Sequence, residues 1–169
     1  TQTVLRLLAW LPKDARLFFA STSEVYAGSV SAGIAPVPTP TNRLIIGVAN
    51  INMPLFVNGN EKVLLKGGWM FAGNSRPDKG GNTVIFGHRW LYKPPVQNTF
   101  YNLDKVAMGD RFTIAWAGKT YTYETSDIKI VNPEDVWVMN STDTSQVTLI
   151  TCAPLFSTKH RLVVVGKLI

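Results

Sequence analysis

The chain has 169 residues, of which 46% are hydrophobic and 17% charged, and its formal net charge is +6 at pH 7. This length suits one domain with a sizeable core and an N-terminal appendage. The basic balance suits an anionic environment such as a cell wall or lipid head groups. We expect no nucleic-acid binding, because no run of Lys and Arg exceeds two residues and no basic helix with interleaved aromatic residues is present.

Cys152 is the only cysteine of the chain, so no internal disulfide can form. A lone cysteine is usually a small buried hydrophobe, and a reactive role for it needs further evidence. No apolar run reaches the roughly 18 residues of a membrane-spanning helix, and no signal peptide is visible.

The N-terminal part of the chain differs from the rest. Residues 1–26 carry apolar side chains at helical spacing, and Pro12 is expected to divide them into two short helices. Residues 28–42 predict an extended linker, because three prolines alternate with other residues there. We therefore divide the chain into a helical segment with a linker, residues 1–42, and a β-rich domain, residues 43–169. The helix either packs on the domain surface or acts as a membrane-proximal or regulatory segment.

Beyond residue 43, Val, Thr and Ile are frequent and turn residues separate short runs, which is typical of β structure. Ala117-Gly118-Lys119 predicts a hairpin between two of these runs. The predicted strands are Leu44–Val48, Asn50–Val57 with a break at Pro54, a short strand within 67–82, Thr83–Phe86, Arg111–Trp116, Thr120–Val131, Gln146–Thr151 and Arg161–Lys167.

Short helical elements are predicted between the strands. Single turns are expected over residues 61–66 and 100–106. A short helix is expected to begin after Asn132, with the Asn side chain as its cap and Pro133 at its first position.

Three residues at predicted strand ends form a candidate catalytic set: His88, Cys152 and Arg161. Pro154 ends the cysteine strand because proline has no N–H for a ladder, and Arg161 begins the return strand. If these strands are neighbours, the thiol and the guanidinium meet at one rim of the sheet. A cysteine nucleophile needs thiolate character, a proton carrier and a donor to the oxyanion, and this set supplies one of each. His160 is expected to be a loop residue facing away from Arg161.

Three stretches of the chain resemble the sortase family. The segment from Thr148 to Cys152, Thr-Leu-Ile-Thr-Cys, resembles the family's T-L-x-T-C signature, and Arg161 follows it as the family requires. Gly87-His88-Arg89 after an apolar strand resembles its histidine motif, and residues 100–110 resemble the segment between the two. The resemblance covers about residues 43–169.

The resemblance implies a mainly β fold, an eight-stranded closed β-barrel with short helices, to which the N-terminal helical appendage is added. It implies a membrane-anchored cysteine transpeptidase on the outer face of Gram-positive-type bacteria, with the anchor in a segment absent from this chain. Such an enzyme cleaves an LPxTG-like sorting motif between Thr and Gly and transfers the acyl group to an amine of a cell-wall precursor.

The residue roles also follow from the resemblance. Cys152 is expected to be the nucleophile that forms a thioester, His88 the general acid and base, and Arg161 the donor to the substrate carbonyl and oxyanion. Thr151 and Trp90 are expected to help bind substrate. No cofactor is expected, and the protein is expected to be a monomer.

Two alternatives remain open. A pilin-polymerising sortase would use a lysine amine, although residues 1–42 lack an Asp-Pro-Trp-like lid anchor. A catalytically silent β-barrel binding module on the cell surface would need none of the three groups. A papain-like protease fits poorly, because its cysteine precedes its histidine.

Acidic and aromatic residues are the two remaining sets that could contribute to a site. We expect no metal site, because the acidic residues found where some sortases bind calcium are scattered and partly explained by helix capping; they are Glu134, Asp135 and Asp143. Most of the aromatic residues that could line a substrate groove are expected to be packing residues; they are Trp69, Phe71, Trp90, Tyr92 and Trp137.

Overall fold

The computed structural model describes residues 42–57, 59–90 and 97–169. The helices predicted over residues 1–26 and all but the end of the linker predicted over residues 28–42 lie outside this part, so they stay predictions, as does the division into two domains. Within the described ranges, no helix is long and apolar enough to cross a membrane.

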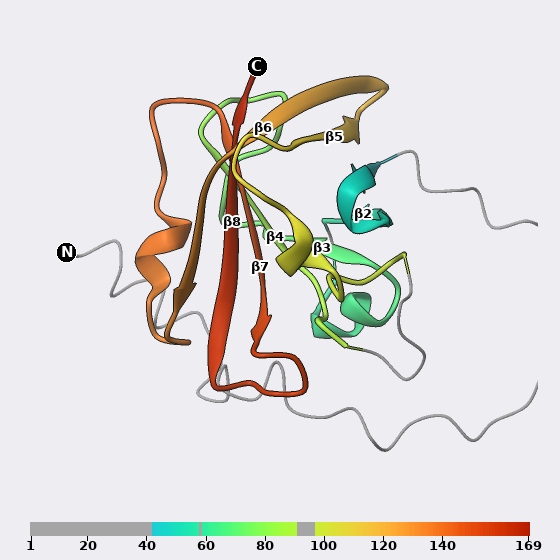
Figure 1. Cartoon of the computed structure of the whole chain (residues 1–169). Helices are drawn as coiled ribbons and strands as arrows, with labels where there is room; N and C mark the ends of the chain where they lie inside the picture. Colours follow the sequence, from blue (N-terminus) through green and yellow to red (C-terminus); the bar gives the residue numbers. More distant parts are fainter. Residues whose placement is uncertain (1–41, 58, 91–96) are drawn as a thin grey trace, which may run out of the picture. The chain divides into compact units, whose positions relative to one another are not determined.

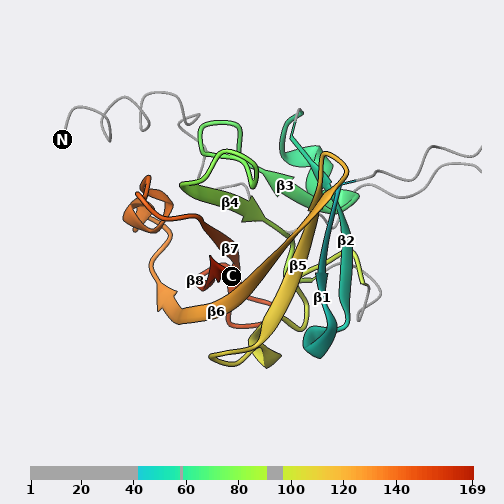
Figure 2. The same cartoon turned by 90° about the horizontal axis from the view of Figure 1, so that it is seen from above.

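The described strands close into a barrel in the order β1-β2-β3-β4-β7-β8-β6-β5 (Figures 1 and 2), which confirms the predicted fold class. Short 3-10 helices lie in the connections. The strands are β1 (Arg43–Ile46), β2 (Ile51–Phe56), β3 (Gly68–Met70), β4 (Asn82–Phe86), β5 (Arg111–Trp116), β6 (Lys119–Val131), β7 (Gln146–Ala153) and β8 (His160–Leu168). The 3-10 helices are η2 (Gly47–Ala49), η3 (Glu61–Leu65), η4 (Leu103–Lys105) and η5 (Val136–Met139).

β2 is continuous, so the predicted break at Pro54 is wrong. Pro54 lies opposite Arg43, while the next residue, Leu55, donates its backbone N–H to Asn42 at 2.9 Å. Pro54 therefore occupies the position whose N–H would point away from β1. The pairing of β2 with β3 begins only at Leu55, so the missing donor costs no ladder hydrogen bond.

The helix predicted after Asn132 starts later and is capped differently. Asp135 accepts a hydrogen bond from the backbone N–H of Asn132 at 2.8 Å, and η5 begins only at Val136 without a side-chain cap. The carboxylate of Asp135 thus closes the turn that the Asn side chain was expected to cap. His160 is likewise not a loop residue: it is the first residue of β8 and pairs with Ala153.

β7 is buried on both of its faces. Side chains such as Leu149 point into the barrel core, where Leu44, Met53 and Val164 are also fully buried. Alternate side chains of β7 point outward and are covered there by a second apolar cluster. That outer cluster consists of Val84, Val131, Ile150 and Val163, against which Val138 and Met139 of the η5 segment pack.

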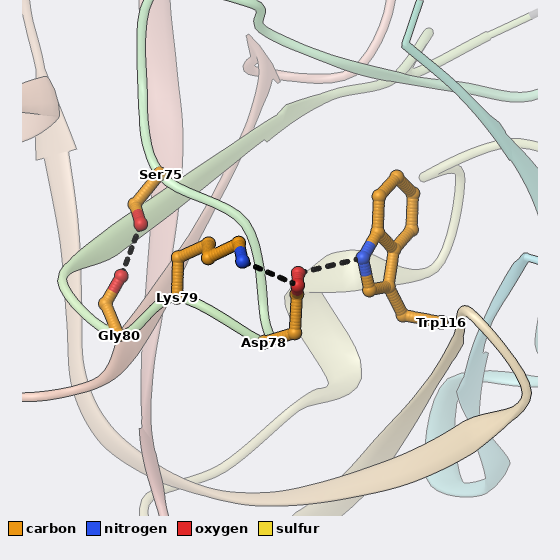
Figure 3. A network of polar contacts seen from close by, with 5 residues as sticks. All are labelled: Ser75, Asp78, Lys79, Gly80 and Trp116. Carbon is orange, nitrogen blue, oxygen red and sulfur yellow. Dashed lines mark hydrogen bonds and ion pairs between the residues drawn. The ribbon is translucent and has the colours of Figure 1, made fainter.

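Polar contacts hold the loop between β3 and β4 (Figure 3). Asp78 accepts a hydrogen bond from the indole Nε1 of Trp116 in β5 at 2.9 Å and pairs with Lys79 at 3.6 Å. Ser75 donates to the carbonyl of Gly80 across the same loop. These contacts fix the loop that leads into β4, and β4 in turn leads to His88.

Candidate active site

β7 and β8 bring Cys152 and Arg161 together on the outer face of the barrel, next to the β7–β8 loop (the lower end in Figure 1). Cys152 lies directly opposite Arg161, which confirms the predicted meeting of thiol and guanidinium. β4 is parallel to β7, with Phe86 opposite Ile150. Continuing this register by two residues brings His88 to the level of Cys152.

The backbone on both sides of His88 is fixed by hydrogen bonds. The N–H of Gly87 donates to the carbonyl of Ile150 at 3.2 Å, and the hydroxyl of Thr151 donates to the carbonyl of Gly87 at 2.8 Å. The N–H of Phe100 donates to the carbonyl of His88 at 2.8 Å. A Cβ at Gly87 would lie 2.5 Å from the Phe100 ring, so only glycine lets the chain pass here.

Thr151 does not lie where a substrate residue was expected. Its side chain is fully buried, and its hydroxyl is engaged with the carbonyl of Gly87. The structure therefore gives Thr151 a contact with the histidine segment, and no surface for a direct substrate contact.

Arg161 is held by its own loop. Its Nη1 donates to the carbonyls of Thr158 and His160 at 2.8 and 2.9 Å. Burial lowers the pKa of Arg161, while the charges of Cys152 and Glu134 act in the opposite direction. A guanidinium stays charged under these conditions, so the site holds a fixed cation beside the thiol.

Burial favours the neutral forms of the two titrating groups. It raises the pKa of the Cys152 thiol to about 11, against the opposing effects of Arg161 and Arg89. It also lowers the pKa of His88. At pH 7 a thiol with this pKa is ionised in about one molecule in ten thousand, so the thiolate–imidazolium form is a small minority species.

Two exposed aromatic rings lie beside these strand ends. Trp90, which follows the histidine segment, is 41% exposed and packs edge-to-face on Phe156 of the β7–β8 loop, with ring centroids 5.5 Å apart. Phe156 is 69% exposed and adopts a φ of 64°, which a bulky side chain rarely adopts. Sequence reasoning missed Phe156; an aromatic residue inside the loop between Cys152 and Arg161 was the available signal.

The other candidates are placed as follows. Trp69 and Phe71 pack with Phe86, and Lys129 lies over the ring of Trp137 at 4.9 Å. Tyr92 lies outside the described residues. Among the described residues, no group of three or more His, Cys, Asp or Glu side chains could hold a metal ion, and this includes the acids singled out in the sequence.

The chain is similar to known proteins in sequence and in fold. The Sortase domain family model matches residues 44–169. Sortase A of Listeria monocytogenes serovar 1/2a is 27% identical over 158 residues, which are 92% of this chain and 69% of that protein. Among solved structures, "Sortase C1 of GBS Pilus Island 1" has a TM-score of 0.70 and 34% identity, over 79% of this chain and 66% of that one. Sortase A from Corynebacterium diphtheriae has a TM-score of 0.69 and 28% identity, over 76% of this chain and 60% of that one.

Proposed function

This chain belongs to the sortase family of cysteine transpeptidases, and on that premise we propose that it cleaves an LPxTG-like sorting motif between Thr and Gly and transfers the acyl group to an amine. The observation that carries the proposal is the pairing of Cys152 with Arg161, next to the strand β4 that leads to His88. The proposed site of action is the outer face of the cytoplasmic membrane, where cell-wall precursors are available.

The first step forms a thioester. The Cys152 thiolate attacks the carbonyl carbon of the substrate threonine, and Arg161 donates hydrogen bonds to the oxyanion that develops. His88, as the imidazolium, gives its proton to the glycine nitrogen as the C–N bond breaks.

The second step reverses these roles. The incoming amine attacks the thioester carbonyl carbon, and neutral His88 takes a proton from the amine nitrogen. The C–S bond then breaks, the acyl group leaves on the amine, and the thiolate is restored.

Trp90 and Phe156 are proposed to contact an apolar side chain of the sorting motif. Their exposed rings lie beside the strand ends that carry the reaction, and aromatic rings supply large contact area at low entropic cost. Phe156→Ala is expected to raise KM about three- to tenfold with little change in kcat, because it removes apolar contact and leaves the reacting groups in place. Steady-state kinetics on a sorting peptide measures this, and an unchanged KM would contradict it.

Intact mass spectrometry tests the proposed reaction. An LPxTG-type peptide is expected to leave an acyl adduct on Cys152, and added oligoglycine is expected to discharge it into a ligated product. Cys152→Ala should give neither species. If a panel of sorting motifs yields no adduct with the native chain, a catalytically silent surface module becomes the better description.

A pilin-polymerising sortase is the second candidate. It is favoured by the solved structure "Sortase C1 of GBS Pilus Island 1", which is 34% identical to this chain with a TM-score of 0.70. The two candidates differ in the amine they use. Competition between oligoglycine and a lysine-containing pilin-type peptide for the same thioester separates them, since the preferred acceptor dominates the ligated product.

A further inference from the structure

Arg89, beside His88, is the second buried cation of the described residues. It is 6% exposed and Arg161 is 7% exposed, and no other charged residue within the described ranges is buried. Arg89 directly follows His88, and its charge, like that of Arg161, acts on Cys152. Both buried guanidiniums therefore act on the same thiol.

Asp104 holds this guanidinium in place. Arg89 Nη2 lies 3.0 Å from Asp104 Oδ2 in η4. The turn that leads into η4 also holds the histidine segment, because Phe100 donates its backbone N–H to the carbonyl of His88 at 2.8 Å. One turn of chain thus fixes both the backbone of His88 and the charge of Arg89.

Stability does not explain the burial of Arg89. Its Nε is buried and has no hydrogen-bond partner in the described part of the chain. A desolvated donor without an acceptor disfavours folding, and an apolar side chain of similar length would pack here without that penalty. Its positive charge is the property that an apolar side chain could not supply.

We propose that Arg89 is a positioning residue whose fixed charge, together with that of Arg161, favours the thiolate form of Cys152, and that Asp104 keeps its guanidinium in place. The inference rests on the proposed role of Cys152 as nucleophile. Burial disfavours the thiolate, and the two guanidiniums oppose that effect. The loop that holds Arg161 leaves it to act on the substrate carbonyl, whereas Arg89, paired with Asp104, acts on the thiol through its charge.

The rate of Cys152 alkylation by iodoacetamide at pH 8 tests the proposal, because it depends on the thiolate fraction and needs no substrate. Arg89→Gln keeps an amide donor toward Asp104 and removes the charge. It is expected to slow alkylation about three- to tenfold, which corresponds to a higher pKa of the thiol. Arg89→Lys keeps the charge and is expected to retain at least about half of the native rate.

Arg111→Met is the matched control. It removes the same charge from an exposed pair with Glu124, whose Oε2 lies 3.3 Å from Arg111 Nε. Glu124 lies opposite Lys167, and Lys167 pairs with Gln146 at the end of β7 far from Cys152. Cys152 in the Arg111→Met variant should be alkylated at the rate of the native chain.

Two results would overturn the proposal: a native alkylation rate in folded Arg89→Gln, or an equal loss in Arg89→Gln and Arg89→Lys. If Arg89→Gln fails to fold, Asp104→Asn gives the same test with opposite sign. The Asn side chain keeps an oxygen that can accept from the guanidinium, so Arg89 stays in place while the opposing negative charge is removed. Alkylation should therefore accelerate at least about twofold, and an unchanged or slower rate would contradict the proposal. The variants could show the expected alkylation rates while the native chain forms no peptide adduct. That result would count against the proposed transpeptidation and not against the effect of Arg89.

Discussion

The ionisation of Cys152 and His88 sets the pH dependence expected of the reaction. Burial raises the pKa of the thiol to about 11 and lowers that of the imidazole. Both groups therefore favour their neutral forms, whereas the reactive thiolate–imidazolium form needs both to be charged. Between these two pKa values each rise in pH increases the thiolate and decreases the imidazolium by equal factors.

Transpeptidation is therefore expected to be nearly flat between about pH 7 and 10, with an acid limb set by His88 and a basic limb set by Cys152. Alkylation needs only the thiolate and should rise about tenfold per pH unit over the same range. Parallel pH series of peptide cleavage and iodoacetamide labelling measure both. An alkylation rate that levels off near pH 8.5 would show that the thiol is not shifted.

Thr151 is expected to act on the reaction through His88. Thr151→Val removes the hydrogen bond from its hydroxyl to the carbonyl of Gly87 at nearly constant volume. We expect kcat/KM to fall about tenfold and the free energy of unfolding to fall by about 1 kcal/mol, because the histidine segment loses one anchor. The alkylation rate should stay close to native, since the surroundings of the thiol are unchanged.

Thr125→Val is the control for this prediction. Thr125 is also buried, and its hydroxyl donates to the carbonyl of Asp110 at 3.0 Å on another part of the barrel. A similar loss of stability with native kcat/KM is expected. Equal losses of kcat/KM in Thr151→Val and Thr125→Val would contradict the proposal that Thr151 positions His88.

The sequence could single out His88, Cys152 and Arg161 as candidates, because each stands at the end of a recognisable strand within a family motif. It could not single out Arg89 and Phe156, for which roles are proposed above. Their importance depends on distances to residues on other strands, which spacing along the chain does not encode. The contact of Thr151 with the carbonyl of Gly87 could not be predicted either, because it joins two segments that are far apart in the sequence.

At the scale of elements, η5 is held by polar side chains of other segments. Asn82 in β4 donates its amide to the carbonyls of Val138 and Asn140 at 3.3 and 3.0 Å and accepts the hydroxyl of Thr148 at 2.8 Å. Asn74 of the β3–β4 loop donates to the carbonyl of Met139 at 2.7 Å. The segment between β6 and β7 is therefore fixed to β4 and β7 by polar contacts as well as by its apolar side chains.

Asn82→Ala is expected to cost about 2–4 kcal/mol of stability, because it leaves one hydroxyl and two carbonyls without these partners. The segment 132–145 should become more sensitive to proteases. KM should rise, since this segment begins next to Val131, which pairs with Arg161. Limited proteolysis, thermal unfolding and kinetics measure the three effects. Asn98→Ala, which removes only a 3.4 Å contact to Lys66, serves as control and should change none of them.

Local elements were predictable where the signal was local. The hairpin of β5 and β6 and the turn of η3 follow from residues adjacent in the sequence. The first residue of η5 could not be predicted from the sequence, because Asn132 and Asp135 both carry side chains that can close the turn before it. Whether β2 continues through Pro54 depends on whether a neighbouring strand would accept a hydrogen bond at that position, and the sequence around Pro54 does not show this.

At the scale of the whole molecule, Cys152 and Arg161 lie on the outer face of the barrel and the main apolar core fills its inside. Leu44→Ala creates a cavity among fully buried side chains of the core. The free energy of unfolding should fall by about 2–5 kcal/mol, whereas the alkylation rate of folded Cys152 should stay native. Calorimetry and labelling at low temperature check this. A parallel loss of alkylation would show that the core and the outer face are coupled.

Sequence patterns predicted the individual strands, whereas their closure into an eight-stranded barrel was expected only from the family resemblance. The order of strands was beyond reach of local patterns, because the parallel pairs β2–β3 and β4–β7 join segments that are not consecutive strands of a hairpin. Such pairings are decided by the burial of whole faces, which no short window of sequence records.

The parallel pairing of β4 with β7 also governs when the site can form. His88 follows β4, whereas Cys152 and Arg161 belong to β7 and β8, the last two strands of the barrel. A growing chain therefore carries its thiol without its partners until these strands have docked, and contacts between segments so distant in sequence form slowly. Before docking, the thiol behaves as an ordinary exposed cysteine. Reactivity toward a sorting signal is thus acquired together with the completed fold.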